Sequence, residues 1–449
     1  MMSRSILLSF FLFVVSEGFL MAQATVEARG YATLASAITA AGPGGTVHVD
    51  SGFRTTLNGK PAIVINFPVT IECDKGATFT LTAKVDALVI HSNHVRLIGA
   101  CALVNSASPP TATAVNNNDG YSYLEVGGWT FSGFANFILL PDGDHQNIHD
   151  NSMMNGGYIP IFVKGNFTNS SIARNHIACT RGVSSSTAIA IFSNGGNVHG
   201  DTVDANEITG GCSGAGISVG NYSSPNTGAA PYDMQITNNH ATFGGVTGTI
   251  GYSFSPMSHS VVSHNTAKLS DGSTGYAAFE NVSQANAVKN NTTGVSESNT
   301  YVGNEAYGAW QYCQTLDWGS SRNMVAGLTC QGFSSAGVLV YNGSNGGYAL
   351  ANDGNVIRNS AFTAGSGTGS WLNGIWLEGN ASDAVITNTV ISGNSIDMSQ
   401  PAGAQNRGIT LEQDHGRIDS TTVDGNSIKN ARTGLSSGSA TNVSGSNLN

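Results

Sequence analysis

The stretch Ile172-Ala173-Arg174-Asn175-His176-Ile177 contains the pattern that decides the fold. Its asparagine follows an apolar residue by three positions and precedes another by two. The same pattern recurs around eight more asparagines: Asn151, Asn206, Asn239, Asn265, Asn291, Asn359, Asn394 and Asn426. Apart from one longer gap, consecutive copies lie 24 to 35 residues apart. A period of this length is typical of proteins built from stacked repeats.

A second pattern lies between these copies and consists of a glycine followed by alternating apolar and variable residues. Examples are Gly374-Ile375-Trp376-Leu377 and Gly408-Ile409-Thr410-Leu411. Alternation with a period of two predicts short strands with one buried face. Two or three such strands per repeat predict one coil of a parallel β-helix, because each coil buries its apolar face only against its neighbours. The repeated asparagine would hydrogen-bond backbone groups and its own copy in the next coil.

The front of the chain fits the same plan. Residues 33–41 are predicted to form a short helix with Leu34, Ala37, Ile38 and Ala41 on one side, and the glycines and proline of 42–45 end it. Such a helix would cap the exposed core at one end of the stack. We therefore predict an all-β fold for residues 25–449: a single-stranded right-handed parallel β-helix of about 11–13 coils with a short N-terminal capping helix.

Residues 1–24 have the features of a signal peptide. Arg4 precedes the apolar run Ile6–Val15, and Ala22-Gln23-Ala24 fits a small-x-small cleavage site. We expect a secreted protein, extracellular or periplasmic, without a membrane span, because the run is too short to cross a bilayer. An even number of cysteines in an exported chain predicts disulfides, with the pairing left open: Cys73, Cys101, Cys179, Cys212, Cys313 and Cys330.

The composition limits the partners of the protein. The 449 residues include 18 Lys+Arg and 28 Asp+Glu, which gives a formal net charge of −10. A chain with so few cations lacks the basic face that a nucleic-acid backbone requires, so we expect no nucleic-acid partner. The 57 glycines disfavour a large helical protein. We expect a monomer that binds a polysaccharide substrate or glycan ligand.

The predicted opening helix, the strand-like run Gly44-Gly45-Thr46-Val47-His48-Val49 and the asparagine-centred coils together resemble the pectin lyase-like superfamily. The resemblance covers almost the whole chain after residue 24 and implies the β-helix fold. The superfamily includes pectate lyases, polygalacturonases, alginate lyases, mannuronan epimerases, phage tailspikes and adhesins, so it does not decide the reaction. The polygalacturonase-like hydrolases carry their catalytic acids on one sheet, but their Asn-Thr-Asp, Asp-Asp and Gly-His-Gly motifs are absent from this sequence.

Strand register predicts a column of outward acids on one sheet. If Ile375 and Leu377 point inward, then Trp376 and Glu378 point outward. The same rule, with Ala277 and Phe279 inward, extends the column over neighbouring coils: Glu280, Asp317, Tyr341, Glu378 and Glu412. Like charges about 4.8 Å apart repel, so such a column indicates a cation, a shared proton or a functional need.

We select catalytic and substrate-binding candidates from this column and its surroundings. The catalytic candidates are Glu378, Glu412 and Asp317. Aromatic rings pack on sugar faces and acids bind hydroxyl groups, so the substrate-binding candidates are Trp376, Tyr341, Glu280, Asp414, His415 and Arg407. We predict no metal site, since His176, Glu207 and His240 recur once per coil, a spacing too wide for zinc.

The leading hypothesis is an enzyme that cleaves a polysaccharide, more like a glycoside hydrolase than a lyase, and without a required cofactor. A lyase would instead use Ca²⁺ to neutralise a uronate and a base such as Arg407 or Arg417. The alternative from a different class is a non-catalytic glycan-binding or adhesin-type β-helix. Outward acids also keep a sheet soluble and discourage edge pairing, so the column alone does not decide between these functions.

Overall fold

The computed structural model describes residues 24–107, 111–117, 119–180, 186–221, 229–283, 294–343, 351–365, 371–399 and 405–445. The predicted signal peptide lies outside the described residues except for Ala24, and so does the copy of the repeat around Asn291. Within the described part, no helix is long and apolar enough to cross a membrane.

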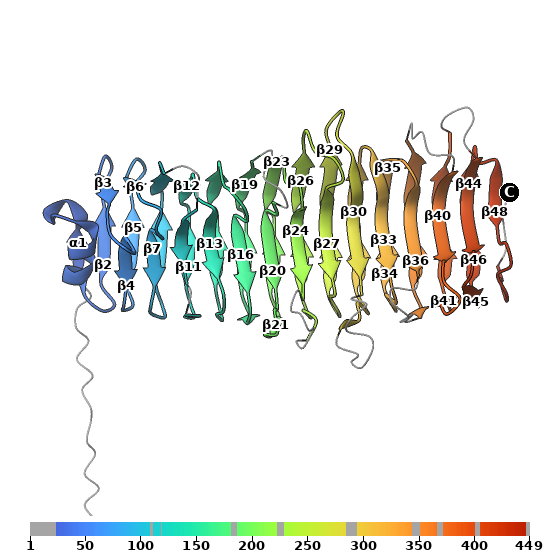
Figure 1. Ribbon diagram of the computed structural model, residues 1–449, viewed down its shortest axis with the longest axis horizontal. Helices are drawn as coiled ribbons and strands as arrows, with labels where there is room; N and C mark the ends of the chain where they lie inside the picture. The colour runs from blue at the N-terminus through green and yellow to red at the C-terminus, as the bar shows by residue number, and fades with distance from the viewer. Residues whose placement is uncertain are drawn as a thin grey trace, which may run out of the picture.

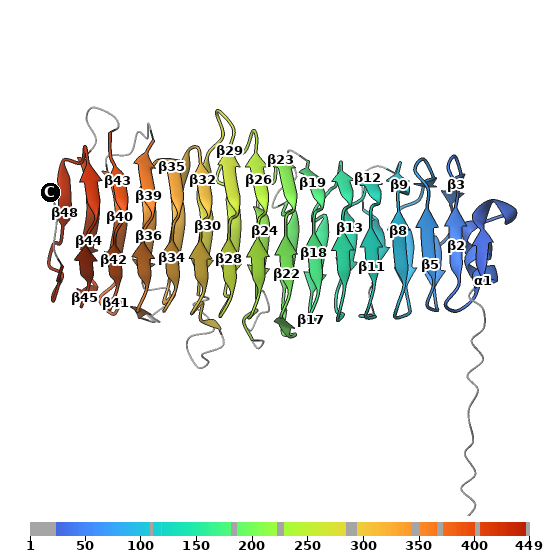
Figure 2. The ribbon, with the colours of Figure 1, turned by 180° about the vertical axis from the view of Figure 1, so that it is seen from behind.

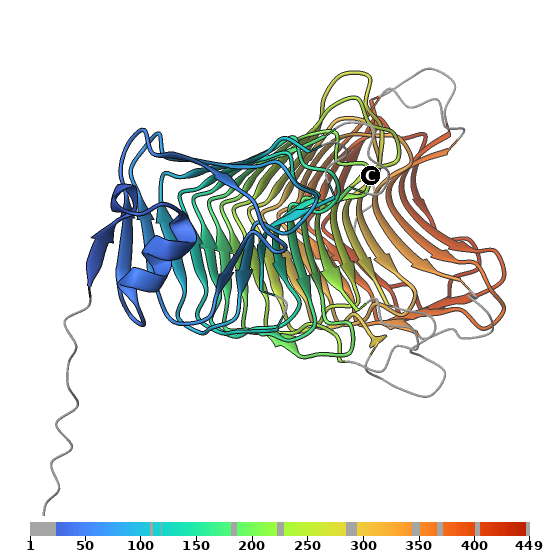
Figure 3. The same ribbon diagram turned by 60° about the vertical axis from the view of Figure 1, so that its left-hand side comes forward.

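Three long parallel sheets form the walls of a β-helix that runs the length of the molecule (Figure 1). The view from behind and the oblique view show the coils stacked in chain order (Figures 2 and 3). The first sheet has 15 strands, in this order: β1 (Thr25–Glu27), β2 (Thr46–Val49), β5 (Thr70–Cys73), β8 (Arg96–Gly99), β11 (Glu125–Gly127), β14 (Asn147–His149), β18 (Ser171–Ala173), β22 (Thr202–Asp204), β25 (Gln235–Thr237), β28 (Val261–Ser263), β31 (Thr300–Val302), β34 (Met324–Ala326), β38 (Val356–Arg358), β42 (Val390–Ser392) and β46 (Thr422–Asp424).

The second sheet has 14 strands and follows the first after a bend in each coil. Its strands are β3 (Arg54–Leu57), β6 (Thr78–Leu81), β9 (Ala102–Asn105), β12 (Thr130–Ser132), β15 (Ser152–Met154), β19 (His176–Cys179), β23 (Glu207–Gly210), β26 (His240–Phe243), β29 (Thr266–Leu269), β32 (Glu305–Tyr307), β35 (Thr329–Phe333), β39 (Ala361–Ala364), β43 (Ser395–Asp397) and β47 (Ser427–Lys429).

The third sheet also has 14 strands, and these grow longer toward the C-terminal half. They are β4 (Ile63–Ile65), β7 (Leu88–Ile90), β10 (Thr113–Asn116), β13 (Asn136–Leu140), β16 (Ile161–Lys164), β20 (Ile189–Phe192), β24 (Ala215–Gly220), β27 (Ile250–Ser255), β30 (Gly275–Val282), β33 (Trp310–Asp317), β36 (Ala336–Asn342), β40 (Trp371–Gly379), β44 (Gln405–Gln413) and β48 (Thr433–Ser436). The strands from β30 to β44 have 7 to 9 residues and present the broadest part of this face.

Two short sheets complete the strands, one of β17 (Phe167–Thr168) with β21 (Val198–His199), the other of β37 (Asn352–Asp353), β41 (Val385–Thr387) and β45 (Arg417–Asp419). The 14-stranded sheets correspond to about 14 coils, slightly more than the 11–13 predicted. The excess lies at the front, where the coils before Asn151 lack the asparagine that marks a repeat.

The core lies inside the three sheets and is built from apolar residues that recur coil after coil, with some strands contributing one and others, such as β6 with Phe79 and Leu81, contributing two. In the first sheet, Ile148 pairs with Ile172 and Ile172 with Val203, and all three are fully buried. The predicted inward alternation is therefore confirmed here. Because each coil buries its residues against the next, the stack is stable only as a whole.

The predicted helix is also present as α1 (Leu34–Ala41), preceded by the short 3-10 helix η1 (Ala28–Gly30). Thr33 caps it: its side-chain oxygen accepts from the Ser36 backbone N–H at 3.1 Å, and the Ser36 hydroxyl oxygen accepts from the Thr33 N–H at 3.1 Å. This reciprocal capping box satisfies two N–H groups that a helix start leaves unpaired. The four predicted apolar residues of α1 are buried, and the helix covers the first coil (Figure 1).

The asparagines form a buried ladder at the bend between the first and second sheets. The backbone N–H and the Nδ2 of Asn206 donate to Oδ1 of Asn239 at 3.0 and 2.9 Å, and the Nδ2 also donates to the Ile172 carbonyl at 2.9 Å. The same arrangement links Asn151, Asn175, Asn206, Asn239, Asn265 and Asn304, and again Asn394 and Asn426. The predicted contact of each asparagine with its own copy is confirmed for these residues.

One predicted member of the ladder is wrong. Asn359 lies one residue too early, with φ 50°, and Ser360 takes the ladder position, where its N–H donates to Oδ1 of Asn394 at 3.0 Å. The cause is that Val356 and Ile357 are both apolar, and it is Ile357 that pairs with the inward Ile391. In this coil the predicted pattern, which begins at Val356, is therefore one residue out of frame with the strand.

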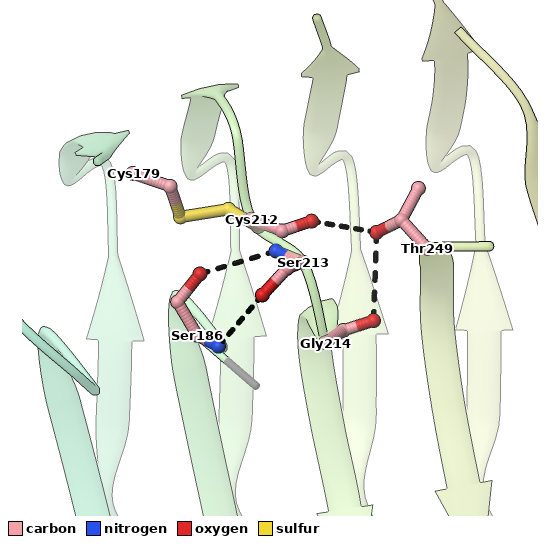
Figure 4. Close-up of a disulfide and its surroundings, with 6 residues drawn as sticks. All are labelled: Cys179, Ser186, Cys212, Ser213, Gly214 and Thr249. Atoms are coloured by element: carbon pink, nitrogen blue, oxygen red, sulfur yellow. Dashed lines mark hydrogen bonds between the residues drawn. A yellow bond between two sulfur atoms is a disulfide. The ribbon is translucent and has the colours of Figure 1, made fainter. Parts of the chain in front are cut away.

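Three disulfides join the six cysteines: Cys73–Cys101, Cys179–Cys212 and Cys313–Cys330. The prediction of disulfides is confirmed, and the structure supplies the pairing. Figure 4 shows Cys179–Cys212 beside Thr249, whose hydroxyl donates to the Cys212 carbonyl at 2.7 Å. The third pair joins β33 of the third sheet to β35 of the second, with both cysteines fully buried.

The ladder predicts a large effect of a small substitution. Asn206→Ala removes the acceptor of the buried Asn175 backbone N–H and the amide donor to Asn239 Oδ1 and the Ile172 carbonyl, which costs about 2–3 kcal/mol in the free energy of unfolding. Urea unfolding followed by circular dichroism measures this. Asn147→Ala, an exposed asparagine of the first sheet, is the matched control and should change stability by less than about 0.5 kcal/mol. Equal effects of the two substitutions would contradict the role of the ladder.

Candidate functional site

The third sheet brings three of the predicted acids into one outward column. Glu378 of β40 pairs with Glu412 of β44 on one side and with Tyr341 of β36 on the other. Asp317 of β33 pairs with Tyr341. Four neighbouring strands therefore contribute Asp317, Tyr341, Glu378 and Glu412 at one level of the sheet.

Glu280 does not continue this column as predicted. It pairs with Thr315, and Val282 is the residue that pairs with Asp317. Glu280 thus stands in the adjacent outward column, which leads through Thr315 to Leu339 and Trp376. The reason is that Gln314, a polar residue that is fully buried, lies opposite the inward Phe279. The predicted alternation places the apolar Leu316, in place of Gln314, opposite Phe279, so the predicted register differs from the observed one by two residues.

The inward position of Ala277 is also wrong. Ala277 lies in an outer apolar cluster with Tyr312, Ala336 and Leu339, whereas Ala278 belongs to the main core. The consecutive residues Ala278 and Phe279 both belong to the main core, so strict alternation is interrupted at this level, and glycine is needed in later coils. A Cβ on Gly374 would lie 2.4 Å from the side chain of Ile396. The outer cluster packs against Tyr276, Tyr341 and Trp376, which lie beside the predicted acids.

Two adjoining hollows lie on this face of the third sheet. We call the first the Glu412 hollow; it has a volume of about 600 Å³ and is lined by Gln311, Tyr312, Ser334, Ser335, Trp371, Asn373, Trp376, Glu378, Arg407, Glu412 and Asp414. We call the second the Asp317 hollow; its volume is about 440 Å³ and it is lined by Ser253, Ser255, Tyr276, Glu280, Val282, Tyr312, Asp317, Trp318, Leu339, Tyr341 and Glu378. Tyr312 and Glu378 line both hollows, so the two adjoin at these residues.

The structure brings together eight of the nine candidate residues along these hollows. The ninth, His415, is exposed and is not among the described residues that line either hollow. Sequence reasoning missed Trp371 and Tyr276. Trp371 is 44 % exposed, and the guanidinium of Arg407 lies over its ring at 4.0 Å from the centroid. The signal for Trp371 was its place at the start of the long strand that carries Trp376 and Glu378.

Glu378 has an unusual acidity for a surface carboxyl. Burial, the adjacent Glu412 carboxylate and Asp414 together raise its pKa to about 7, against the hydrogen bond that Asn380 donates to its Oε1 at 3.2 Å. Desolvation and like charges both disfavour the ionised form. Glu378 therefore retains a proton in the range where most carboxyl groups have lost theirs.

The Asp317 hollow holds two further acids with raised pKa values, Asp317 and Glu280. Complete burial raises the pKa of Asp317 well above its ordinary range, and Glu280 adds to the effect. Burial also raises the pKa of Glu280, although the Ser253 hydroxyl donates to its Oε2 at 2.6 Å. The raised pKa values favour the neutral forms of Asp317 and Glu280, which can donate hydrogen bonds.

This arrangement is suited to acid–base chemistry on a polar ligand. Glu378 and Glu412 lie on neighbouring strands, and the raised pKa of Glu378 favours its protonated form. In such a pair one carboxyl group can give a proton to the ligand while the other acts as a nucleophile or accepts a proton. Neighbouring strands lie about 4.8 Å apart, close to the separation of about 5–5.5 Å found in retaining glycosidases. Among the described residues, no group of three His, Cys, Asp or Glu side chains could hold a metal ion.

Comparison with known proteins identifies the fold. No family model matches the sequence, and no curated protein matches it. A mutant tailspike protein of E. coli bacteriophage HK620 in complex with a pentasaccharide aligns with a TM-score of 0.59 at 12% identity, covering 92% of this chain and 75% of the tailspike. The A-module of a mannuronan C-5 epimerase of Azotobacter vinelandii aligns with a TM-score of 0.51 at 12% identity, covering 94% of this chain and 100% of the module. The fold is thus a right-handed parallel β-helix, as predicted.

The raised pKa of Glu378 makes a prediction about stability. Below about pH 4.5 the folded and unfolded chains both hold this proton; as the pH rises toward about 7 only the unfolded chain releases it, so the free energy of unfolding falls. Glu378→Gln removes this loss. We expect its melting temperature to exceed that of the wild type by about 2 °C at pH 8 and to equal it at pH 4, measured by scanning calorimetry.

The control for this experiment is Glu72→Gln, which changes an exposed glutamate on β5 of the first sheet. It should leave the difference between pH 4 and pH 8 unchanged. If Glu378→Gln stabilised the protein equally at both values, the cause would be packing and not titration.

Proposed function

We propose that the protein is a secreted glycoside hydrolase that cleaves a neutral polysaccharide in the Glu412 hollow. The observation that carries the proposal is the pairing of Glu378 with Glu412 on neighbouring strands, beside Trp376 and in an open hollow. The three disulfides are consistent with an oxidising compartment outside the cytoplasm. The tailspike with the same fold was solved with a pentasaccharide, which adds support for a glycan ligand.

Glu378 is the proposed general acid. Its raised pKa keeps it protonated near neutral pH, so it can give its proton to the glycosidic oxygen as the bond breaks. Glu412 is the proposed partner, which attacks the anomeric carbon or activates water. Because the two residues lie on adjacent strands, we assign Glu412 as nucleophile and expect retention of anomeric configuration.

The lining residues favour an uncharged sugar. Trp371 and Trp376 offer aromatic surfaces of the kind that pack on sugar rings. Arg407 is the only Lys or Arg among the described residues that line the two hollows, and it is stacked on Trp371. A polyuronate would place its carboxylates beside Glu412 and Asp414, where like charges repel. For the same reason elimination from a uronate, with Ca²⁺ bound, is the less supported reaction.

Substitution of the two acids tests catalysis. Glu378→Gln and Glu412→Gln should each reduce the release of reducing ends by about 10³-fold, because each removes a group required in the transition state. The substrates are starch, mixed-linkage β-glucan, xylan, galactomannan, carboxymethylated α-1,3-glucan and polygalacturonate. Glu72→Gln is the matched control and should retain full activity.

If the wild type released neither reducing ends nor unsaturated ends from any of these polymers, the proposal of an enzyme would fail. Binding without cleavage would instead identify a glycan-binding or adhesin-type protein. Release of unsaturated ends from polygalacturonate would identify a lyase.

The pH dependence of the reaction tests the role of Glu378 separately. Because the protonated form is the active one, kcat/KM should fall about tenfold for each unit of pH above about 7. The measurement is the initial rate against pH on the polymer that the wild type cleaves. An activity that stays constant to pH 9 would show that Glu378 is not the proton donor.

A further inference from the structure

Asp317 is a buried acid with an unused hydrogen-bonding atom. Its side chain lines the Asp317 hollow and the residue is only 5% exposed. Within the described residues, its Oδ1 has no hydrogen-bond partner. A buried polar atom without a hydrogen-bond partner lowers the stability of the fold by about 1–3 kcal/mol. A ligand or a water molecule that hydrogen-bonds to this atom would remove that cost.

The groups around Asp317 are acids and phenols, with no cation among the residues that line the hollow. Glu280 and Tyr276 face it from β30, Tyr312 from its own strand, Tyr341 from β36, and Glu378 from β40. Nothing in this set neutralises a carboxylate, which agrees with the raised pKa of Asp317. A protonated carboxyl carries a hydroxyl that can donate a hydrogen bond.

Trp318 lines the same hollow and offers an aromatic side chain there. It holds a left-handed conformation with φ 51°, and its N–H donates to the Tyr341 carbonyl at 2.9 Å. Elsewhere in the described chain this conformation is adopted mainly by Asn, Asp, His, Ser and Gly. Tyr123, Arg174 and Arg322 also adopt it, so the conformation belongs to the bends of the coils, and it is the ring of Trp318 that bears on binding.

We propose that the Asp317 hollow is a second sugar-binding subsite, in which the Asp317 carboxyl donates a hydrogen bond to a sugar hydroxyl and Trp318 supplies aromatic surface. This inference rests on the proposed function in that the ligand is a neutral glycan. Because Tyr312 and Glu378 line both hollows, one glycan chain occupies both and crosses the level of Glu378. Asp317 is thereby a binding residue, in place of the catalytic role expected from its column.

The subsite predicts how binding responds to substitution. In the Glu378→Gln background, which is not expected to cleave, Asp317→Ala should weaken binding about tenfold or more, while Asp317→Asn, which still donates, should weaken it less than about threefold. Trp318→Asn, which suits the backbone conformation, should also weaken binding about tenfold. The probes are the six polymers above, each cast in a native gel, and the retardation of the protein gives its affinity.

Asp119→Ala changes an exposed aspartate far along the chain and is the matched control. Circular dichroism verifies that each variant is folded, and Trp318→Asn keeps the test decisive if Asp317→Ala does not fold. The inference is overturned if no polymer retards the protein, or if Asp317→Ala and Trp318→Asn bind as tightly as their parent. It is also overturned if, in the chain that keeps Glu378, Asp317→Asn abolishes turnover with binding unchanged, since Asp317 would then act in the chemistry.

The two proposals fail in different ways. A wild type that releases reducing ends, together with binding that does not depend on Asp317 or Trp318, overturns the subsite and leaves the hydrolase intact. A protein that releases no ends but is retarded through Asp317 overturns the hydrolase and supports the subsite.

Discussion

The register between neighbouring coils is the constraint on which the rest of the structure depends. Each strand pairs in parallel with its counterpart in the next coil, so a residue type that recurs once per coil lies directly beside its own copy. The buried asparagines hold this register, since each side chain binds both the next asparagine and a carbonyl of the preceding coil. A slip of one residue would place the amides outside and the polar outer residues in the core.

The same stacking has opposite electrostatic results on two faces of the molecule. On the first sheet, burial opposes ionisation of Glu125, but hydrogen bonds from Arg96 and His149 lower its pKa. Arg174 does the same for Asp150 through two bonds of 2.8 Å. On the third sheet, Arg407 shares a hollow with Glu378 and Glu412 but lies over Trp371, none of the ion pairs among the described residues involves either acid, and the pKa of Glu378 is raised. The fold tolerates stacked acids where cations pair with them, so an unpaired stack calls for a separate reason, and function is the reason we propose.

The fold could be predicted because its signal is repeated. The asparagine and its flanking apolar residues recur often enough that a wrong frame in one coil, as at Asn359, does not change the architecture. The site is less repetitive and was predicted less well. Glu280 was misplaced because one buried polar residue, Gln314, interrupts the apolar alternation, and Ala277 because the two residues after it, Ala278 and Phe279, both lie in the main core. No local pattern shows where the alternation is interrupted, since that depends on the glycines and large side chains of adjacent coils.

In the proposed function, burial assigns different roles to the two hollows. Glu378 is partly exposed and stands between the hollows, so it can exchange its proton with solvent and ligand during a reaction. Asp317 is enclosed, and a proton held there is exchanged only with difficulty, which suits a fixed donor better than a group that must alternate between states. Two acids in one column thus acquire different roles from their surroundings, and the strand that separates them contributes Tyr341 at the same level.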